Sequence, residues 1–376
     1  MNRFTRRALA LVTAGTALGI AGAPLSSASA DEGEHAVFVQ TVEAGGNHIV
    51  ALRPGRNGSL SQVASYATGG TGAVAVGAVV DPLASQAGLV YDEEHQVLLS
   101  VNSGSSSVSV FSVRGTRLTL RQTVPSGGSF PASIAIHDDR VQVLNAGGAG
   151  SVVGFRLHGT RLEPVAGATR SLGLSNDAVP FFLTSPGQVG YSADGRFVVV
   201  TTKANNTILT FRVGDEGRLA PNPVVNAPTG AVPFAFESTR SGDLAVVEAG
   251  SSSVTTYHVN RDGTLTSLSS VVEGQKAPCW ITRIGDRFYL GNTGSANLSA
   301  VRIDAAGQGS LVGPTGIVTT TGAGPIDIAV AQNGRVLYSQ QGGAHAVETF
   351  RVNGDGSLTS VGSVTGLPAM EGIVAI

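Results

Sequence analysis

The sequence predicts an all-β fold, a seven-bladed β-propeller whose blades are four-stranded antiparallel sheets. Three repeated features indicate this fold: a Gly-Leu hairpin, a pair of β-rich runs joined by a Gly/Asn/Ser turn, and a short apolar run that begins with proline. Together they place four short strands in about 47 residues, and repeats of roughly 40–50 residues are typical of propeller blades. Four-stranded sheets repeated radially leave only short, protected edges.

The Gly-Leu hairpin sets the number of blades. A glycine is followed two or three positions later by leucine at seven places: Leu60, Leu118, Leu162, Leu219, Leu265, Leu311 and Leu358. About eight residues before most of these leucines an apolar strand is expected to end, at Leu52, Phe111, Phe155, Phe211, Tyr257 and Phe350, with Val301 slightly farther away. Seven hairpins predict seven blades.

The other two features supply the remaining strands of each blade. In three repeats the β-rich runs flank the turns Asn102–Ser107, Lys203–Asn206 and Glu248–Ser253, and Gly and Asn provide the positive φ that tight hairpins need. Runs such as 197–200 are apolar on both faces, as expected for a sheet packed between two others. The inner strands are expected to begin at Pro131, Pro233, Pro278 and Pro325.

The chain ends predict that the ring is closed by the C-terminal strand. The segment His35–Val42 reads as a second strand with no inner strand before it, while Met370–Ile376 repeats the inner-strand pattern at the other end. The last segment should therefore complete the first blade and leave no free edge. The competing fold, an open β-solenoid, would not leave one strand missing at the start and one spare at the end.

Residues 1–30 have the three parts of a secretory signal peptide. Arg3, Arg6 and Arg7 precede an uncharged, mostly apolar run, and Ala28-Ser29-Ala30 offers small residues for cleavage. The two adjacent arginines also suit a twin-arginine signal. An uncleaved anchor is the alternative, but the run is short for a span of about 20 residues. The sequence predicts an exported protein with one propeller domain over residues 31–376.

Composition limits the classes of function. Only 13% of residues are charged and the net charge is −2, which gives no electrostatic footprint for nucleic acid. Nothing after residue 30 could cross a bilayer as a helix. The single Cys279 excludes an intramolecular disulfide and a thiolate zinc site, and no metal or cofactor motif is present. Cys279 and Trp280 are expected on an inner strand, with a buried, unreactive thiol.

Two insertions indicate which face carries a site. The segments Gly69–Gln86 and Ser171–Pro186 both join the fourth strand of one blade to the first strand of the next, so both should rise on one face. Polar residues are expected to converge there at the starts of inner strands and the ends of second strands: Gln188, Asp327 and Glu371, and Asn102, Asn145, Lys203, Glu248, Asn292 and Gln340. The alternative is that these residues satisfy loop backbone groups and hold a water-filled channel together.

The repeat motifs resemble the lactonase-type seven-bladed propellers, which include 6-phosphogluconolactonases and carboxymuconate lactonizing enzymes, and the chain is similar to secreted actinobacterial members. The resemblance rests on the segments 191–200, 325–329 and 350–358 and covers residues 35–376. It implies a site for a small organic acid or its lactone. The family's histidine after the inner-strand proline is absent, because Ala132 follows Pro131 and Gly187 follows Pro186.

Two functions are consistent with the sequence. The first is lactone hydrolysis or lactonization without metal or cofactor, with Glu248 or Glu371 as base and Lys203 as a further catalytic residue. Substrate would be held by Gln188, Asp327, Asn102, Asn145, Asn292 and Gln340. The second is a non-catalytic propeller that binds a small ligand or a protein partner on the insertion-bearing face, so whether the chain is an enzyme stays open at this point.

Overall fold

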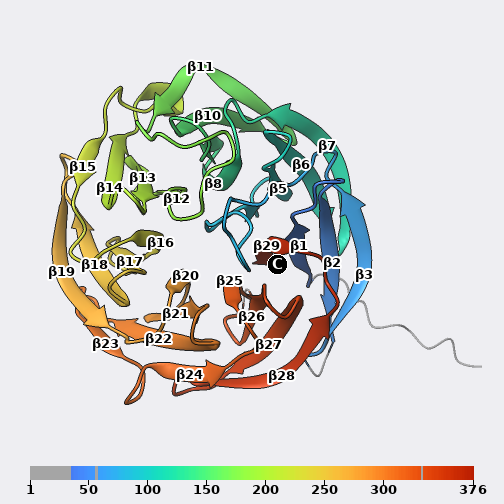
Figure 1. Ribbon diagram of the computed structural model, residues 1–376, viewed down its shortest axis with the longest axis vertical. Coiled ribbons are helices and arrows are strands. Elements are labelled where there is room, and N and C mark those ends of the chain that lie inside the picture. Colours follow the sequence, from blue (N-terminus) through green and yellow to red (C-terminus); the bar gives the residue numbers. More distant parts are fainter. Residues whose placement is uncertain (1–34, 56–57, 332) are drawn as a thin grey trace, which may run out of the picture. The chain divides into compact units, whose positions relative to one another are not determined.

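The computed structural model describes residues 35–55, 58–331 and 333–376. The predicted signal segment 1–30 lies outside the described residues. Seven antiparallel sheets are arranged in a ring, each with its first strand toward the centre (Figure 1). This confirms the all-β, seven-bladed fold. In the described part of the chain the helical structure is one short 3-10 turn, η1 (Asp215–Gly217).

Each sheet runs from an inner strand at the centre to an outer strand at the rim. From the centre outward, the first sheet is β29 (Met370–Ala375), β1 (Val37–Thr41), β2 (His48–Pro54) and β3 (Leu60–Ala67). The second is β4 (Leu89–Asp92), β5 (Val97–Asn102), β6 (Ser107–Arg114) and β7 (Arg117–Pro125). The third is β8 (Pro131–His137), β9 (Arg140–Asn145), β10 (Ser151–His158) and β11 (Arg161–Ser171). The fourth is β12 (Pro186–Tyr191), β13 (Phe197–Thr202), β14 (Thr207–Arg212) and β15 (Val224–Asn226).

The remaining three sheets follow the same order. The fifth is β16 (Pro233–Ser238), β17 (Leu244–Glu248), β18 (Ser253–Val259) and β19 (Leu265–Val272). The sixth is β20 (Pro278–Ile284), β21 (Arg287–Asn292), β22 (Asn297–Ile303) and β23 (Gly309–Leu311), and β24 (Ile317–Thr320) also pairs with β22. The seventh is β25 (Pro325–Val330), β26 (Val336–Gln341), β27 (Ala346–Val352) and β28 (Leu358–Thr365). The divided outer strand of the sixth sheet is a departure from the expected four strands.

The C-terminal strand closes the ring as predicted. β29 pairs antiparallel with β1, and Val37 lies opposite Ala375. Backbone hydrogen bonds join Ala36 and Ile376 in both directions, at 3.2 and 2.9 Å. In Figure 1 the red end of the chain lies beside the blue β1. The first sheet is thus assembled from both ends of the described chain, which removes the free edge that an open ring would expose.

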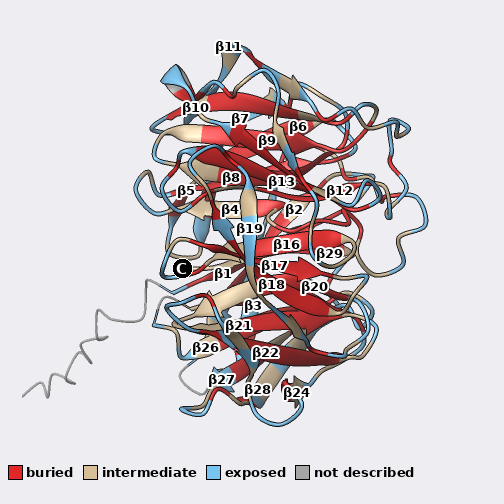
Figure 2. Ribbon diagram, turned by 90° about the vertical axis from the view of Figure 1, so that its left-hand side faces the viewer, coloured by how far each residue is buried: buried red, intermediate tan, exposed pale blue. Residues whose placement is uncertain are grey.

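Buried aromatic residues repeat from sheet to sheet and fill the space between neighbouring blades. The strand-end residues predicted from the hairpin spacing are all buried: Leu52, Phe111, Phe155, Phe211, Tyr257 and Phe350. Figure 2 shows the buried strands in red, with exposed residues confined mostly to loops and outer strands. Burying one such side chain stabilises the fold by about 1.5–3 kcal/mol. The core is therefore distributed around the ring between the sheets.

Candidate functional site

The two insertions meet over one end of the ring. Val76 of the first and Phe181 of the second form a parallel β-bridge. The Val76 amide donates to the Pro180 carbonyl at 2.9 Å, and the Phe182 amide donates to the Val76 carbonyl at 3.0 Å. Both insertions therefore lie on the same face, as their positions between fourth and first strands predict.

The end of the first insertion enters the central channel. The Ser85 hydroxyl donates to the Ala132 carbonyl of β8 at 2.7 Å. The Gln86 side chain bonds the amide and carbonyl of Ile281 in β20, at 2.9 and 3.1 Å. In Figure 1 this blue-cyan loop before β4 lies among the inner strands. Protein atoms thus occupy this part of the channel, whereas one of the two alternatives drawn from the sequence was a water-filled channel.

This loop brings a carboxylate to two charged residues that belong to other blades. Asp81, in the first insertion, shares a side-chain hydrogen bond with Glu371 of β29 and interacts electrostatically with Lys203. Lys203 follows β13 and donates from Nζ to the Ala84 carbonyl at 2.6 Å. The backbone amides of Leu83 and Ser85 donate to Glu371, the latter at 3.1 Å, and that of Ala84 donates to Asp81 at 2.7 Å. Asp81, Lys203 and Glu371 are called the charged triad below.

Burial shifts all three members of the charged triad toward their neutral forms. It lowers the pKa of Lys203 to about 8, although Asp81, Cys279 and Glu371 oppose the shift. Burial, with the nearby Asp81, raises the pKa of Glu371 well above its usual value. Burial also raises the pKa of Asp81, against the hydrogen bond from Glu371 and the charge of Lys203. Two carboxyls this close cannot both ionise cheaply, so we assign the shared proton to Glu371 and the negative charge to Asp81.

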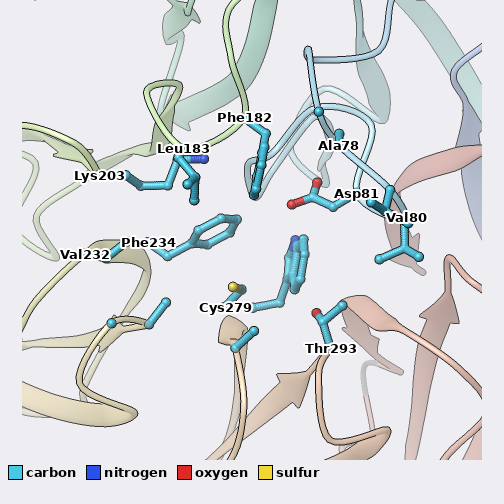
Figure 3. Close-up of a pocket in the computed structure, with 16 residues that line it drawn as sticks. Ala78, Val80, Asp81, Phe182, Leu183, Lys203, Val232, Phe234, Cys279 and Thr293 are labelled. Carbon is cyan, nitrogen blue, oxygen red and sulfur yellow. The ribbon is translucent and has the colours of Figure 1, made fainter.

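A cavity of about 380 Å³ opens beside the charged triad. Asp81 and Lys203 are on its wall, while Glu371, which is hydrogen-bonded to Asp81, is not among the lining residues and is 1% exposed. The other lining residues are mainly apolar and come from both insertions and from the fifth and sixth blades: Gly77, Ala78, Val79, Val80, Phe182, Leu183, Val232, Phe234, Ala249, Gly250, Ala277, Cys279, Trp280 and Thr293. Figure 3 shows Asp81 and the Phe234 ring pointing into the same space.

Aromatic rings hold the lysine side of the cavity. The Lys203 ammonium lies 4.9 Å from the centre of the Phe234 ring, within the range of a cation–π interaction. Phe234 packs edge-on against Trp280, with ring centres 5.1 Å apart. The Trp280 indole donates to the Ser85 carbonyl at 3.0 Å, which ties the ring to the loop in the channel. Cys279 lines the same wall, and burial raises the pKa of its thiol, so the sulfur stays protonated.

The predicted residue Asp327 lies in the channel but not on the cavity wall. It interacts with Asp81 and Glu237 electrostatically, and its Oδ1 accepts from the Ile328 amide at 2.9 Å. Burial raises its pKa to about 7. The folded protein therefore holds a proton here that the unfolded chain releases near pH 4. The contribution of Asp327 to the free energy of unfolding is therefore fully present below about pH 4. It is lost as the pH rises from there through 7.

We expect Asp327→Asn to stabilise the protein at pH 8. Asparagine cannot ionise, so the variant avoids the cost of burying the charge, on the order of 1–3 kcal/mol. Below pH 4 the two proteins should unfold alike, because Asp327 is then neutral in both states. Urea unfolding at pH 8 and at pH 3.5 checks this, and equal differences at both pH values would contradict it.

The predicted residue Glu248 is separated from the charged triad. It is the last residue of β17, fully buried, and is not among the residues that line the cavity. Three hydroxyls of its own blade donate to its carboxylate: Ser253 at 2.9 Å, Thr255 at 2.7 Å and Tyr257 at 2.5 Å. This arrangement suits a residue that holds a hairpin together.

We therefore expect Glu248→Ala to lose stability rather than catalytic capacity. The substitution removes the carboxylate that accepts from three buried hydroxyls and leaves Ser253 and Thr255 only their bonds to Ser251 and Ser270, at a cost of about 3 kcal/mol. Urea unfolding should show the loss, while turnover per folded molecule stays within about twofold, well under the tenfold that corresponds to 1.4 kcal/mol. A stable variant without turnover would instead return Glu248 to the catalytic role that the sequence suggested.

The other predicted residues bond mainly to neighbouring strands. Gln188 accepts from the Phe236 amide at 2.7 Å, and Gln340 bonds the amide and carbonyl of Gly372, each at 3.2 Å. The three asparagines donate within or next to their own blades: Asn102 to Ser107 and Ser109, Asn145 to the Ser126 carbonyl, and Asn292 to Asn297 and Ser299. Of the nine predicted residues, the structure brings Lys203 and Glu371 together at the cavity, with Asp327 within electrostatic reach.

Sequence reasoning missed Asp81 and the aromatic wall. Asp81 is the one charged residue in the Gly69–Gln86 insertion, and this was a signal that could have identified it. Phe182 and Leu183 similarly lie in the second insertion. Phe234 and Trp280 follow or nearly follow inner-strand prolines, where their sequence suggests only core packing.

The fold and the site define a seven-bladed propeller with a buried charged triad beside a cavity that both insertions line. Its sequence matches the family described as "Lactonase, 7-bladed beta-propeller" over residues 175–282 and 249–371, which together exceed half of the chain. The chain belongs to this lactonase family. No curated protein matches it.

Solved structures agree on the fold. A provisionally named 6-phosphogluconolactonase from Bacteroides uniformis is 17% identical, with a TM-score of 0.69, and the match covers 91% of this chain and 99% of that one. The periplasmic gluconolactonase of Pseudomonas aeruginosa is also 17% identical, with a TM-score of 0.68 and the same coverage. At these identities the likeness establishes the fold alone.

Residues 35–55, 58–331 and 333–376 were searched for metal-binding clusters and for membrane-spanning helices. Within these ranges, no three His, Cys, Asp or Glu side chains are grouped so that they could hold a metal ion. In the same part of the chain no helix is long and apolar enough to span a membrane.

Proposed function

We propose that this protein hydrolyses a small lactone in the cavity beside the charged triad. The observation that carries the proposal is that Asp81 and Lys203 lie together on the wall of the cavity, with Glu371 hydrogen-bonded to Asp81. Burying these ionisable groups costs stability even when they are paired, and groups with perturbed pKa values are concentrated at functional sites. Membership of the lactonase family supports the same reaction.

The triad has the groups that lactone hydrolysis requires. The Asp81 carboxylate takes a proton from a water molecule as that water attacks the lactone carbonyl carbon. The Lys203 ammonium donates a hydrogen bond to the carbonyl oxygen and stabilises the negative charge that develops there. When the ring C–O bond breaks, Asp81 returns its proton to the leaving oxygen, and the product is the hydroxy acid. The reverse sequence forms a lactone from that acid.

Glu371 acts through Asp81 and is a positioning residue. Its proton is directed to the Asp81 carboxylate, and the amides of Leu83 and Ser85 fix its orientation. Because these amides belong to the loop in the channel, Glu371 also anchors that loop to β29. We expect Glu371→Gln to keep a neutral donor to Asp81 but to lose one of the two loop amide bonds, because an NH2 group cannot accept a hydrogen bond. Urea unfolding should therefore show a lower midpoint, while the pH dependence of turnover stays close to that of the wild-type protein.

Lactone hydrolysis by the purified protein tests the proposal directly. A panel of γ- and δ-lactones, sugar-derived and hydrocarbon, should include at least one that opens faster than in buffer and in proportion to protein concentration. Release of one equivalent of acid per turnover is the readout. If no lactone of either kind is opened, the proposed function is wrong.

The pH dependence of hydrolysis should reveal the lysine. Lys203 can donate to the carbonyl oxygen and stabilise its negative charge only while it is protonated. Because its pKa is about 8, the rate of hydrolysis should fall as the pH rises through 8. An ordinary lysine would give no such loss below about pH 10. Lys203→Met should abolish the alkaline limb and lower kcat. A rate that stays constant from pH 7 to pH 10 would contradict the role given to Lys203.

A second function is ligand binding without turnover. It is favoured by the number of polar groups on the cavity wall that already have protein partners, such as Trp280 and Thr293. A ligand released unchanged after it stabilises the protein would support it. We also propose, from the sequence of residues 1–30, that the protein is exported, which fractionation of the native host would test.

A further inference from the structure

We infer that the lactone this site accepts is apolar: the part of the molecule outside the reacting ester is hydrocarbon, alkyl or aryl, and not a sugar or a sugar phosphate. This inference rests on the proposed function and narrows its substrate class. Three features of the molecule support it: the cavity wall, the partners of the polar side chains on that wall, and the surface around the mouth.

Most side chains that line the cavity, and that a ligand would contact, are apolar. Two aromatic rings that pack edge-on, Phe234 and Trp280, form one part of the wall. Phe182 and Leu183 of the second insertion form another part (Figure 3). Val79, Val80 and Val232 complete the enclosure. At about 380 Å³ the cavity is at the small end of the range for ligand sites, about 300–1,000 Å³. A compact hydrocarbon group would exclude water from this wall on binding.

The few polar side chains on the wall have little capacity left for sugar hydroxyls. The Trp280 indole donates to the Ser85 carbonyl, and the Thr293 hydroxyl donates to the Pro325 carbonyl at 2.8 Å. Asp81 accepts from the Ala84 amide and from Glu371, and the proposed reaction uses its remaining capacity for the attacking water. A sugar lactone would exchange its hydrogen bonds with water for contacts with apolar atoms. This exchange weakens binding, because unpaired polar groups are costly to bury.

A phosphate group is also poorly matched to this site. Among the sixteen lining residues, all of them described, Lys203 is the one cation, and Asp81 stands beside it. Phosphate sites usually provide arginine forks, several lysines or clustered backbone amides. Here a phosphate would meet one ammonium whose charge is already balanced by a carboxylate, so the triad can bind a carbonyl oxygen but not a dianion.

Apolar surface continues outward from the cavity. The two insertions expose Val76, Val79, Phe181 and Leu183, with exposed fractions of 55%, 92%, 43% and 49%. Leu183 and Val79 belong to the cavity wall as well. A hydrocarbon chain that is longer than the cavity could therefore leave along these side chains and remain in contact with apolar atoms, which is favourable because it removes apolar area from water.

The test compares three lactones with the same six-membered ring. δ-Decalactone carries a hydrocarbon chain, glucono-δ-lactone carries hydroxyls, and 6-phosphoglucono-δ-lactone adds a phosphate. We expect kcat/KM for δ-decalactone to exceed that for either sugar lactone by about 100-fold or more, since several hydroxyls would each lose their partners in water. A sugar lactone opened as fast as δ-decalactone would overturn the inference while leaving the proposed function standing.

Binding can be followed separately from turnover, because Trp280 is the single tryptophan of the chain and lines the cavity. Its fluorescence should change saturably with δ-decalactone and not with glucono-δ-lactone. If neither lactone is hydrolysed, the proposed function fails, and this titration alone decides the preference of the site. Saturation by the sugar lactone only would overturn the inference.

A matched pair of variants locates the apolar contact. Leu183→Asp places a charge at the mouth of the cavity, and Leu120→Asp places the same charge on the outer strand β7 at a leucine of similar exposure, 40%. We expect Leu183→Asp to raise the KM for δ-decalactone about tenfold or more and Leu120→Asp to change it by less than about twofold. Equal KM values in the two variants would contradict a hydrocarbon contact at this mouth.

Discussion

Asp81→Asn is expected to lower kcat/KM for lactone hydrolysis by about 10²–10⁴-fold, the range that a positioned general base contributes. The amide keeps the shape of the side chain and its bond from the Ala84 amide, but it cannot take a proton from water. Because the cavity wall is otherwise unchanged, lactone binding followed by Trp280 fluorescence should persist. Steady-state kinetics on a lactone that the wild-type protein opens provide the measurement.

Asp177→Asn is the matched control for this variant. Asp177 belongs to the second insertion, is exposed, and is not among the residues that line the cavity. The substitution Asp177→Asn should therefore leave kcat/KM close to the wild-type value. If Asp81→Asn keeps more than half of the activity, another group must act as the base, and the role given to Asp81 is wrong.

Removal of residues 370–376 should have the largest effect on stability. The deletion takes away β29, including buried Met370 and Ile373, which contribute about 1.5–3 kcal/mol each. It also exposes the edge of β1 and removes Glu371, which holds the loop in the channel. The expected loss exceeds about 5 kcal/mol, a large part of the 5–15 kcal/mol that stabilises a typical protein. Circular dichroism and gel filtration should show an unfolded or aggregated chain.

A milder variant separates closure of the ring from simple chain shortening. Ile373→Ala keeps the strand and its backbone bonds, and should cost about 2–5 kcal/mol through the lost packing alone. The variant should still unfold cooperatively in urea, at a lower midpoint. A chain without residues 370–376 that folds and unfolds like the wild-type protein would contradict closure by β29.

The fold could be predicted because its signals are local and repeated. The inner strands β8, β16, β20 and β25 begin at the expected prolines, and each hairpin turn falls where Gly, Asn and Ser interrupt two β-rich runs. If the strand boundaries are ambiguous in one repeat, the pattern of the other six repeats indicates where they lie. The divided outer strand of the sixth sheet has no such support, because the outer strands are the least regular part of the repeat. The third and fourth blades are also interrupted there, between Pro164 and Thr169 and between Leu219 and Val224.

The site was only partly predictable, because side-chain direction alternates along a strand. Glu248 is the last residue of β17 and bonds the hydroxyls five and seven positions later, as Asn102 does at the end of β5. Lys203 stands one position beyond the end of β13. The equivalent residues one position beyond β17 and β21, Ala249 and Thr293, also line the cavity. Successive side chains of a strand point to opposite faces of its sheet. Lys203 and Glu248 differ by one position relative to the ends of their strands, so Lys203 reaches the cavity and Glu248 does not.

Asp81 could not be placed by repeat reasoning at all. It belongs to an insertion that most of the blades lack, and its position follows from contacts across the channel to Glu371 and Lys203. These partners lie 290 and 122 positions farther along the chain. Only the closed ring, with β29 beside β1, brings the three together.

The structure of Asp81→Asn with δ-decalactone tests the central claim most directly. We expect an unopened lactone in the cavity, its hydrocarbon chain against Phe234 and Trp280 and its carbonyl oxygen within hydrogen-bond distance of the Lys203 ammonium. A lactone bound away from Lys203, for example beside Glu248 or on an outer strand, would contradict the assignment of this site.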